Sequence, residues 1–206
     1  MNISKKGQKR YDSIIEAAQE LFLQNGYENT SLNQIVTKSG GSLASVYKFF
    51  ENKEKLFMAI LKIKMDEFKC ELDALTVLKE SNDLSEFLNA FGLVYFEIFY
   101  KPESTKFFRI VIAETYKSKD LAQLTAQLMT DVIIKTIADF LRKPNIAPLL
   151  KCGDAEAVAF SFCSLIREPF FFRTLILGEE PKPKTKEEKM QIVAGIVDSF
   201  LNGICK

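Results

Sequence analysis

Apolar residues recur every three or four positions along almost the whole chain, which is the spacing of amphipathic α-helices. The strict alternation that marks a half-buried strand is not found. Capping residues, glycines and prolines separate the apolar segments and mark where helices start and stop. The predicted helices run over about 8–25, 53–78, 104–113, 120–141 and 154–177. A further helix begins at Asp83 and stops at Pro102, and the last one runs from Thr185 to about Asn202. A kink is expected at Pro169. The sequence therefore predicts an all-α protein.

Residues 31–57 hold the most informative pattern, because they predict two short helices that are joined at Gly40–Gly41 and followed by a third. Ser31 and Gln34 have the spacing of a capping box, and Ser42 is placed to cap the second helix. The two glycines permit the positive φ angles that a tight turn between crossed helices needs. The pattern predicts a helix-turn-helix unit.

The second helix of this unit is predicted to pack Val46, Phe49 and Phe50 inward. Its outward face then carries Leu43, Ala44, Ser45, Tyr47 and Lys48. Hydroxyl groups and a lysine on an exposed helix can reach the base edges or the phosphates of DNA. We therefore predict that these five outward residues contact DNA.

Cations lie on both sides of the helix-turn-helix unit. Asn52 is predicted to cap the third helix, which places Lys53 at the positive end of that helix, a position suited to a phosphate. Residues 1–10 contain four cations and no acidic residue, so this segment is either a DNA-binding arm or a solvated terminus. Its position directly before the helix-turn-helix unit favours the arm. The predicted DNA contacts are completed by Ser31, Ser42, Lys53, Lys9 and Arg10.

The spacing of seven positions resembles the N-terminal DNA-binding domain of the TetR/AcrR family of one-component repressors. These positions are Thr30/Ser31, Ile35, Gly40, Ser42, Tyr47, Phe50 and Lys53. Ser39 and Gly41 stand where the family commonly has Ala and Val, which predicts a looser turn and a recognition helix that is poorly ordered without DNA. Further along, the segments FGLVYFEIFYKPE, FCSLIREPF and FLNGI resemble CmeR-type repressors of multidrug efflux pumps.

This resemblance implies a helix-turn-helix DNA-binding domain over residues 1–52. It also implies a helical ligand-binding and dimerisation domain over residues 53–206, with the helix at about 53–78 linking the two. A multidrug efflux operon is the implied target. A rigid helix across the boundary can convert a change in one domain into a displacement of the other.

Composition excludes several classes of protein. Of 206 residues, 47% are hydrophobic and 27% are charged, with a net charge of +1, which is ordinary for a soluble globular chain. Histidine, the commonest general base and metal ligand, is absent from the sequence, so we expect no enzyme activity, no cofactor and no metal. Cys70, Cys152, Cys163 and Cys205 form no CxxC pair and are expected to be reduced thiols. Without a signal peptide or an 18-residue apolar run, the protein is expected in the cytoplasm and away from membranes.

Eighteen phenylalanines and no tryptophan are an unusual composition. The rings form either a phenylalanine-rich core or the lining of an apolar chamber for a small molecule. Arg167 shares a helical face with several of them and needs an anionic partner, which is Glu97, Glu114 or Glu168, or else the acidic end of a ligand. The predicted ligand site consists of Tyr95, Phe96, Phe99, Phe160, Cys163, Ser164, Arg167 and Phe171.

The last two predicted helices carry apolar stripes that are too wide for one small domain. The stripes consist of Val158, Phe162, Leu165, Phe172, Ile192, Ile196 and Phe200. The family resemblance implies that these helices pair with their copies in a four-helix dimer interface. A two-fold dimer places two recognition helices in successive major grooves, roughly 34–36 Å apart, and reads a palindromic operator in double-stranded DNA.

Two functions of different classes fit these features. The first is a homodimeric transcriptional repressor that leaves its operator when a hydrophobic or amphipathic anionic small molecule binds. The second is a helical carrier or sequestering protein for fatty-acyl or bile-acid-like molecules, without specific DNA binding. The basic arm and the predicted recognition helix favour the repressor.

Overall fold

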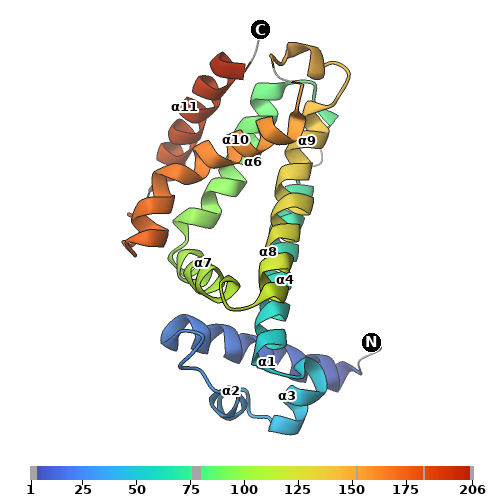
Figure 1. The fold of residues 1–206 in the computed structure, drawn as a ribbon, viewed down its shortest axis with the longest axis vertical. Coiled ribbons are helices and arrows are strands. Elements are labelled where there is room, and N and C mark those ends of the chain that lie inside the picture. The colour runs from blue at the N-terminus through green and yellow to red at the C-terminus, as the bar shows by residue number, and fades with distance from the viewer. Residues whose placement is uncertain (1–3, 76–79, 152, 183, 205–206) are drawn as a thin grey trace. The chain divides into compact units, whose positions relative to one another are not determined.

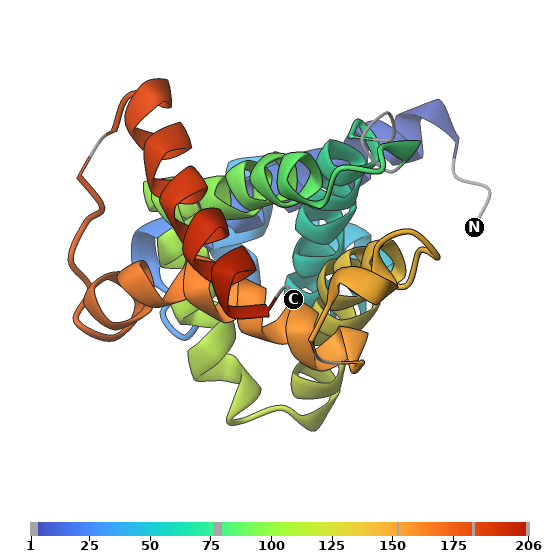
Figure 2. The same ribbon diagram turned by 90° about the horizontal axis from the view of Figure 1, so that it is seen from above.

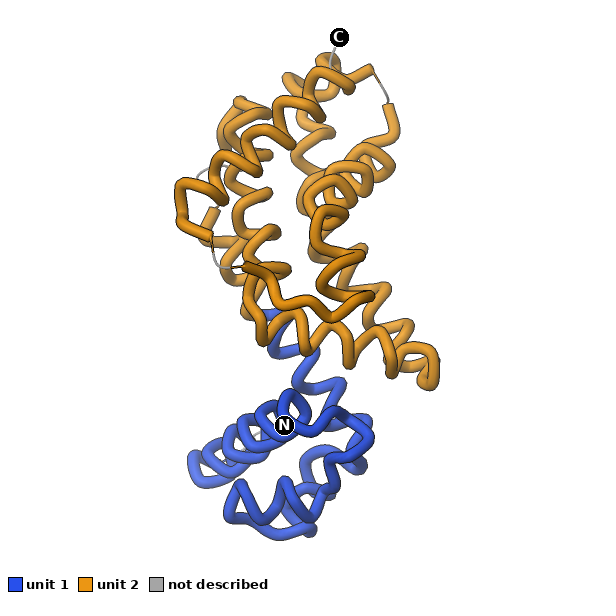
Figure 3. The backbone as a smooth tube through the Cα atoms, turned by 90° about the vertical axis from the view of Figure 1, so that its left-hand side faces the viewer, with its two compact units in different colours: residues 1–66 blue, residues 67–206 orange. Residues whose placement is uncertain are grey.

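The computed structural model describes residues 4–75, 80–151, 153–182 and 184–204, which contain helices and no β-strand (Figure 1). The prediction of an all-α protein is therefore confirmed for the described part of the chain. Contacts divide the chain into two compact units, Met1–Asp66 (unit 1) and Glu67–Lys206 (unit 2), which Figure 3 colours separately.

Unit 1 contains α1 (Lys5–Asn25), α2 (Leu32–Ser39), α3 (Leu43–Phe50) and the beginning of α4 (Lys53–Asp73). The Ser4 hydroxyl accepts a hydrogen bond from the amide of Gly7 at 3.2 Å, so α1 begins at Lys5 and not at the predicted Gln8. The helix ends as predicted, where Gly26 takes a φ of 81°. α1 packs against both α2 and α3.

The core of unit 1 takes one apolar face from each of its helices. Its fully buried side chains include Ile14, Ala18, Phe22, Ile35, Val46, Leu56 and Ile60. Leu56 and Ile60 belong to α4, so the first turns of α4 are part of this core. The contact boundary between the units lies inside α4, after Asp66, whereas the predicted domain boundary follows residue 52.

α4 ends at Asp73, whereas the predicted linking helix extends to about residue 78. Ala74 and Leu75 follow in a turn, in which the Leu75 amide donates to the Leu72 carbonyl at 3.0 Å. Residue 78 lies outside the described part of the chain, so the predicted end of the helix is not observed directly.

Unit 2 is a bundle arranged around α6. Its elements are α6 (Leu84–Tyr100), α7 (Pro102–Thr115), α8 (Lys119–Leu128), η1 (Met129–Ile134), α9 (Lys135–Leu141), η2 (Ala147–Leu149), α10 (Ala155–Phe170), η3 (Phe171–Ile176) and α11 (Lys186–Ile204). α7, α10 and α11 all pack against α6, and α10 also packs against α9 and α11 (Figures 1 and 2). The apolar faces of these helices meet in a single core around α6.

Pro102 begins a helix as well as following one. α6 starts as predicted after Asp83, whose carboxylate accepts from the amide of Glu86 at 2.9 Å, and it ends at Tyr100. Pro102 is the first residue of α7. Proline suits this position because its ring fixes φ and its missing N–H would have had no helical partner. α7 is therefore longer at both ends than the predicted helix over 104–113.

Two helices contain π-helical segments that a 3.6-residue pattern does not predict. The helix predicted over 120–141 is interrupted by η1, and the helix predicted over 154–177 ends in η3. α10 runs past Pro169 to Phe170, and η3 follows directly. Pro169 has no amide hydrogen, so the carbonyl four residues earlier loses its helical partner just before the π-helical segment.

α11 begins with the predicted capping box. The Thr185 hydroxyl accepts from the Glu188 amide at 3.2 Å, and the Glu188 carboxylate accepts from the Thr185 amide at 2.7 Å. Among the described residues, no helix combines the length and the apolar character needed to cross a membrane.

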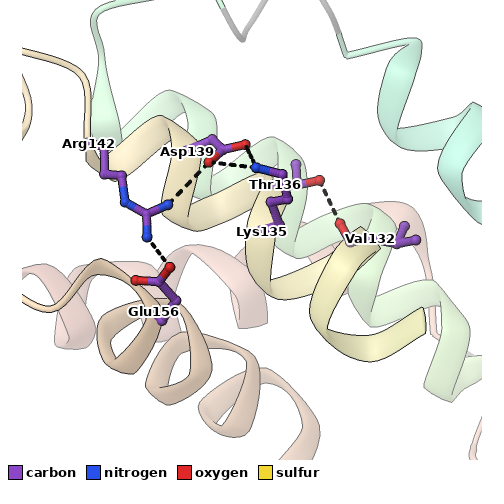
Figure 4. A network of polar contacts seen from close by, with 6 residues as sticks. All are labelled: Val132, Lys135, Thr136, Asp139, Arg142 and Glu156. Carbon is purple, nitrogen blue, oxygen red and sulfur yellow. Dashed lines mark hydrogen bonds and ion pairs between the residues drawn. The ribbon is translucent and has the colours of Figure 1, made fainter. Parts of the chain in front are cut away.

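An exposed polar network joins α9 to α10 (Figure 4). Asp139 accepts from Lys135 at 2.9 Å and from Arg142 at 3.2 Å, and Arg142 also pairs with Glu156 of α10. The hydrogen bond to Glu156 raises the pKa of Arg142. Because water screens exposed ion pairs, the buried contacts between α9 and α10 contribute more to this junction than the network does.

Candidate functional sites

α2 is closed at both ends as the sequence predicts. The Ser31 hydroxyl accepts from the Gln34 amide at 3.2 Å, and the Gln34 side-chain oxygen accepts from the Ser31 amide at 2.6 Å. At the other end, Gly40 takes a φ of 69° in the left-handed region. The Ser31 hydroxyl also donates to Gln34 at 2.9 Å, so this exposed serine is held in the cap that begins α2.

The second glycine of the turn has a different role from the first. Gly41 does not take the positive φ that glycine permits, and a Cβ there would lie 3.2 Å from the Arg10 guanidinium. Arg10 donates to the Ser39 carbonyl at 2.9 Å, at the last residue of α2. Arg10, predicted to contact DNA, therefore holds the turn from within unit 1. The Gly41 amide also donates to the Val36 carbonyl at 3.2 Å, so hydrogen bonds close the turn that was predicted to be loose.

α3 presents the predicted outward face. Ser42 caps the helix by accepting from the Ser45 amide at 3.2 Å. Ala44, Tyr47 and Lys48 are exposed, and Tyr47 exposes 53% of its surface despite its aromatic ring. Leu43 and Ser45 are half-buried beside them, while Val46 and Phe50 are buried as predicted and Phe49 is half-buried.

Lys53, which was predicted to contact a phosphate, is hydrogen-bonded within unit 1. Its ammonium donates to the carbonyls of Tyr27, Glu28 and Thr30 at 2.9, 3.4 and 3.1 Å. An ammonium has three N–H groups, so these carbonyls occupy its donor capacity. We correct the predicted role of Lys53 accordingly: it binds the loop between α1 and α2.

The basic segment before the helix-turn-helix unit is helical. Lys5, Lys6 and Lys9 lie on the first turns of α1 and are exposed. Exposed lysines on a helix can approach phosphates without an extended arm. Lys9 thus keeps the geometry needed for its predicted role, whereas its neighbour Arg10 is turned toward α2.

In unit 2, the predicted ligand site is partly a packed core. Tyr95, Phe96, Phe99 and Cys163 are buried. The ring centroids of Phe96 and Tyr100 lie 4.4 Å apart in a stack, and those of Tyr95 and Phe99 lie 5.2 Å apart edge to face. These rings therefore contact one another, as the phenylalanine-rich core alternative predicts.

Phe160 was wrongly predicted to belong to this site, because 52% of it is exposed. The buried stripe of α10 passes through Ala159, Cys163 and Ile166. Phe160 lies one residue, or about 100°, beyond that stripe. Ser164, Arg167 and Phe171 are half-buried at the edge of the buried stripe.

Arg167 has a buried Nε atom with no hydrogen-bond partner among the described residues. Its guanidinium carbon lies 5.4 Å from the centre of the Phe171 ring. Of the three carboxylates considered as partners, Glu97 pairs with Lys189 at 2.7 Å, Glu114 pairs with Lys117 at 3.0 Å, and Glu168 is exposed. These three carboxylates therefore do not explain the position of this cation.

The thiol of Cys163 and the hydroxyl of Tyr95 interact electrostatically with Arg167, and both groups are neutral. Burial raises the pKa of the Cys163 thiol to about 12, although the positive charge of Arg167 partly offsets this effect. Burial also raises the pKa of Tyr95. Neither group supplies an anion to Arg167 at neutral pH. Within the described residues, no cluster of three potential metal ligands is present either.

The predicted dimer residues separate into two sets. Val158, Phe162 and Phe200 are buried within unit 2, and the Phe162 ring lies 5.1 Å from that of Phe200 and 6.4 Å from that of Phe91. Phe162, Val158 and Phe200 are therefore core residues of the chain itself, which corrects the prediction.

The second set remains accessible. Leu165 and Phe172 expose 45% and 58% of their surface, and Ile192 and Ile196 are half-buried on α11. Phe160 belongs with the exposed residues of α10. We call Phe160 and Leu165 of α10 and Phe172 of η3 the exposed apolar set.

Family comparisons match both units. Residues 14–60 match the family described as "Bacterial regulatory proteins, tetR family". Residues 86–203 match "AefR-like transcriptional repressor, C-terminal domain", which alone covers more than half of the chain.

Curated relatives match over shorter segments. The chain is 34% identical over 83 residues to the HTH-type transcriptional repressor ComR of Escherichia coli K12, a match that covers 40% of each protein. It is 38% identical over 69 residues to the HTH-type transcriptional regulator QacR of Staphylococcus aureus, covering 29% of this chain and 37% of QacR. The matched segments thus span less than half of these relatives.

Solved structures match over nearly the full length. A TetR-family transcriptional regulator from Mesorhizobium loti superposes with a TM-score of 0.83 at 22% identity, covering 98% of this chain and all of that one. The flavonoid-responsive regulator FrrA superposes with a TM-score of 0.73 at 27% identity, covering 96% of this chain and 98% of FrrA.

Proposed function

Because the chain belongs to the TetR family, whose members are transcriptional regulators and not enzymes, we propose that it represses transcription by binding a palindromic operator as a homodimer. In this proposal a small molecule binds unit 2 and releases the operator. The observation that carries the DNA-binding part is the outer face of α3, where Ala44, Tyr47 and Lys48 are exposed on a helix that Ser42 caps.

The DNA contacts divide by chemistry. Lys48 and Lys9 are exposed cations and are assigned to phosphates, while Ala44 and the neighbouring Ser45 are small enough to approach base edges. Tyr47 is assigned to the DNA backbone beside them. The protein acts in the cytoplasm, where it meets the chromosome.

Dimerisation is proposed through the exposed apolar set together with Ile192 and Ile196 on α11. Large apolar side chains that are exposed to solvent favour contact with another surface. Two-fold pairing would present two α3 helices to successive turns of DNA, which is the arrangement a palindrome requires.

The proposed ligand has an apolar body and an acidic end. The buried Nε of Arg167 has no hydrogen-bond partner in the described part of the chain, which supports an anionic group, and the half-buried ring of Phe171 beside it supports an apolar body. FrrA, a regulator of similar fold, is described as flavonoid-responsive. The earlier resemblance to CmeR-type repressors supports a multidrug efflux operon as target. Release requires that the ligand prefer the form that does not bind DNA.

The test begins with a duplex selected from random sequences by the wild-type protein, followed by gel-shift titration. A series of apolar carboxylic acids and their uncharged amides is then titrated against the complex. We expect the acids to release the duplex at lower concentration than the amides, and Arg167→Gln to remove this difference. If no duplex is enriched but the acids bind in calorimetry, the carrier function replaces the repressor. If acids and amides remain equal in the wild type, Arg167 does not select the ligand.

A further inference from the structure

Lys53 connects the two ends of the helix-turn-helix segment. Thr30 lies just before Ser31, the residue that caps α2. After α3, the residues Glu51 and Asn52 lead to Lys53, the first residue of α4. The Lys53 ammonium donates to the Thr30 carbonyl at 3.1 Å, across 23 positions of sequence. This hydrogen bond closes residues 30–53, which contain α2, the turn and α3, into a ring.

The ammonium is enclosed on more than one side. It also donates to the Tyr27 and Glu28 carbonyls, and it lies 4.3 Å from the centre of the Tyr27 ring. The Tyr27 ring in turn lies 5.3 Å from Phe22 and 5.2 Å from Phe57, both of which are buried in the core of unit 1. Lys53 therefore binds a loop that is anchored in the core, and the aromatic face adds a cation–π contact.

Both sides of the closing hydrogen bond are held in place. The buried Thr30 hydroxyl donates to the Gly26 carbonyl at 2.8 Å, which orders the loop on one side. On the other side, Asn52 accepts from the Lys55 amide at 2.8 Å and begins α4. A contact between two ordered segments fixes their relative position, because neither segment can move without breaking its own hydrogen bonds.

We propose that Lys53 is a positioning residue for DNA recognition. It sets the distance between the start of α2 and the end of α3, and thereby the angle at which α3 meets DNA. This role differs from a phosphate contact, for which Lys53 has no N–H group left. The inference rests on the proposed DNA binding of unit 1.

The two roles predict different salt dependence. A phosphate contact releases counterions, so its loss flattens the plot of log affinity against log salt by about 0.9 for each cation. A positioning residue reduces affinity for the selected duplex while leaving that slope and the affinity for random DNA nearly unchanged. Lys48 is the matched control, because it is an exposed lysine five residues earlier on the outer face of α3.

The experiment uses the full chain with Lys53→Met, which keeps an unbranched apolar stem, and with Lys48→Met. Affinities for the selected duplex and for a random duplex are measured over a salt series. For Lys53→Met we expect a loss of about tenfold or more on the selected duplex only, with an unchanged slope. For Lys48→Met we expect a weaker affinity for both duplexes and a slope reduced by about 0.9. A reduced slope with equal losses for Lys53→Met would overturn the proposal, and so would unchanged affinity.

Hydrogen exchange tests the same role without DNA. Amides of residues 27–31 should exchange faster in Lys53→Met, whereas those of the α1 core should not. Lys53→Arg is the second variant, in case Lys53→Met fails to fold. It keeps the charge, but its planar guanidinium cannot direct three donors from one atom, so we expect the same loss of specificity. Wild-type binding by Lys53→Arg, or unchanged exchange in both variants, would contradict the positioning role. A wild-type protein that binds no duplex would refute the proposed function, while the exchange result would still decide whether Lys53 orders the loop.

Discussion

Replacing Phe162 by alanine should destabilise the chain itself and not its association with a second copy. Phe162 is fully buried in unit 2, and its ring contacts those of Phe91 and Phe200. A Cβ at Gly92 would lie 3.4 Å from the Phe162 ring, so α6 approaches it closely. The side chain therefore fills the space between α6, α10 and α11, and its removal leaves a cavity that these helices cannot easily close.

The expected cost follows from this burial. Phe→Ala substitutions in packed cores lower the free energy of unfolding by about 3–5 kcal/mol. For a chain of this size, each kcal/mol lowers the melting temperature by about 2–4 °C, so Tm should fall by roughly 6–20 °C. Leu165→Ala is the matched control, because Leu165 lies on the same helix but exposes 45% of its surface. Its effect within a single chain should stay within about 0.5 kcal/mol.

Thermal unfolding followed by circular dichroism, at several protein concentrations, separates the two kinds of residue. A core defect lowers Tm equally at every concentration, whereas an interface defect makes the loss depend on concentration. Light scattering on the folded proteins then reports the mass. We expect Phe162→Ala to keep the wild-type mass. A monomeric Phe162→Ala protein with a nearly unchanged Tm would refute the core assignment and return Phe162 to a dimer interface.

Three further predictions concern separate parts of the chain. Gly92→Ala should lower Tm, because its Cβ would lie 2.8 Å from the Val193 side chain. The overpacking cost of about 1–3 kcal/mol exceeds the roughly 1 kcal/mol gained in helix propensity. Val193→Ala in the same chain should restore part of the loss. Cys152 and Cys205 are replaced by serine, and the remaining thiols are titrated with Ellman's reagent at pH 8. One thiol, the exposed Cys70, should react in the native protein and two should react in denaturant, because burial and a pKa of about 12 protect Cys163. Two reactive thiols in the native protein would contradict the burial of Cys163. Ser45→Leu should abolish binding to the selected duplex in gel shifts without changing Tm, and a large loss of stability would mean that Ser45 is a packing residue.

The helix starts could be predicted because capping is a local property of the sequence. Ser31, Ser42, Asp83 and Thr185 each accept from an amide three residues ahead, and all four were predicted from residue type and spacing alone. The left-handed turn at Gly40 was predictable for the same reason, since only a few residues adopt that conformation easily.

The partners of the cations could not be predicted in this way. Lys53 and Arg10 both donate to backbone carbonyls, and every residue has such a carbonyl, so no residue type marks the partner. For Arg10 the one signal in the sequence was the second glycine of the turn, because glycine also occurs where another group approaches the backbone closely.

Periodicity also left the faces of α10 undecided. Phe160 and Phe162 are two positions apart, about 200° around the helix, and both are large and apolar. Which of them meets the core depends on where α6 and α11 lie, and that information is not local to α10. The structure buries Phe162 and exposes Phe160, the reverse of the predicted chamber and interface.

The π-helical segment η1 determines which side chains of the following helix meet the core. Leu121 and Leu124 are buried on α8. At 3.6 residues per turn, an unbroken α-helix would continue their face to positions near 128, 132, 135 and 139. Lys135 and Asp139 would then point inward. They are instead exposed and paired with each other, while Ile137 is buried.

This shift has a consequence for how the length of the chain can vary. A π-helical turn holds one residue more than the α-helical turn it replaces, so losing a single residue between 129 and 134 can convert η1 to a regular helix. The apolar residues before and after the deletion would keep their directions, and the Lys135–Asp139 pair would stay at the surface. A homologous chain that is one residue shorter here can therefore have the same core, whereas an equal deletion within α6 would rotate every later side chain of that helix by about 100°.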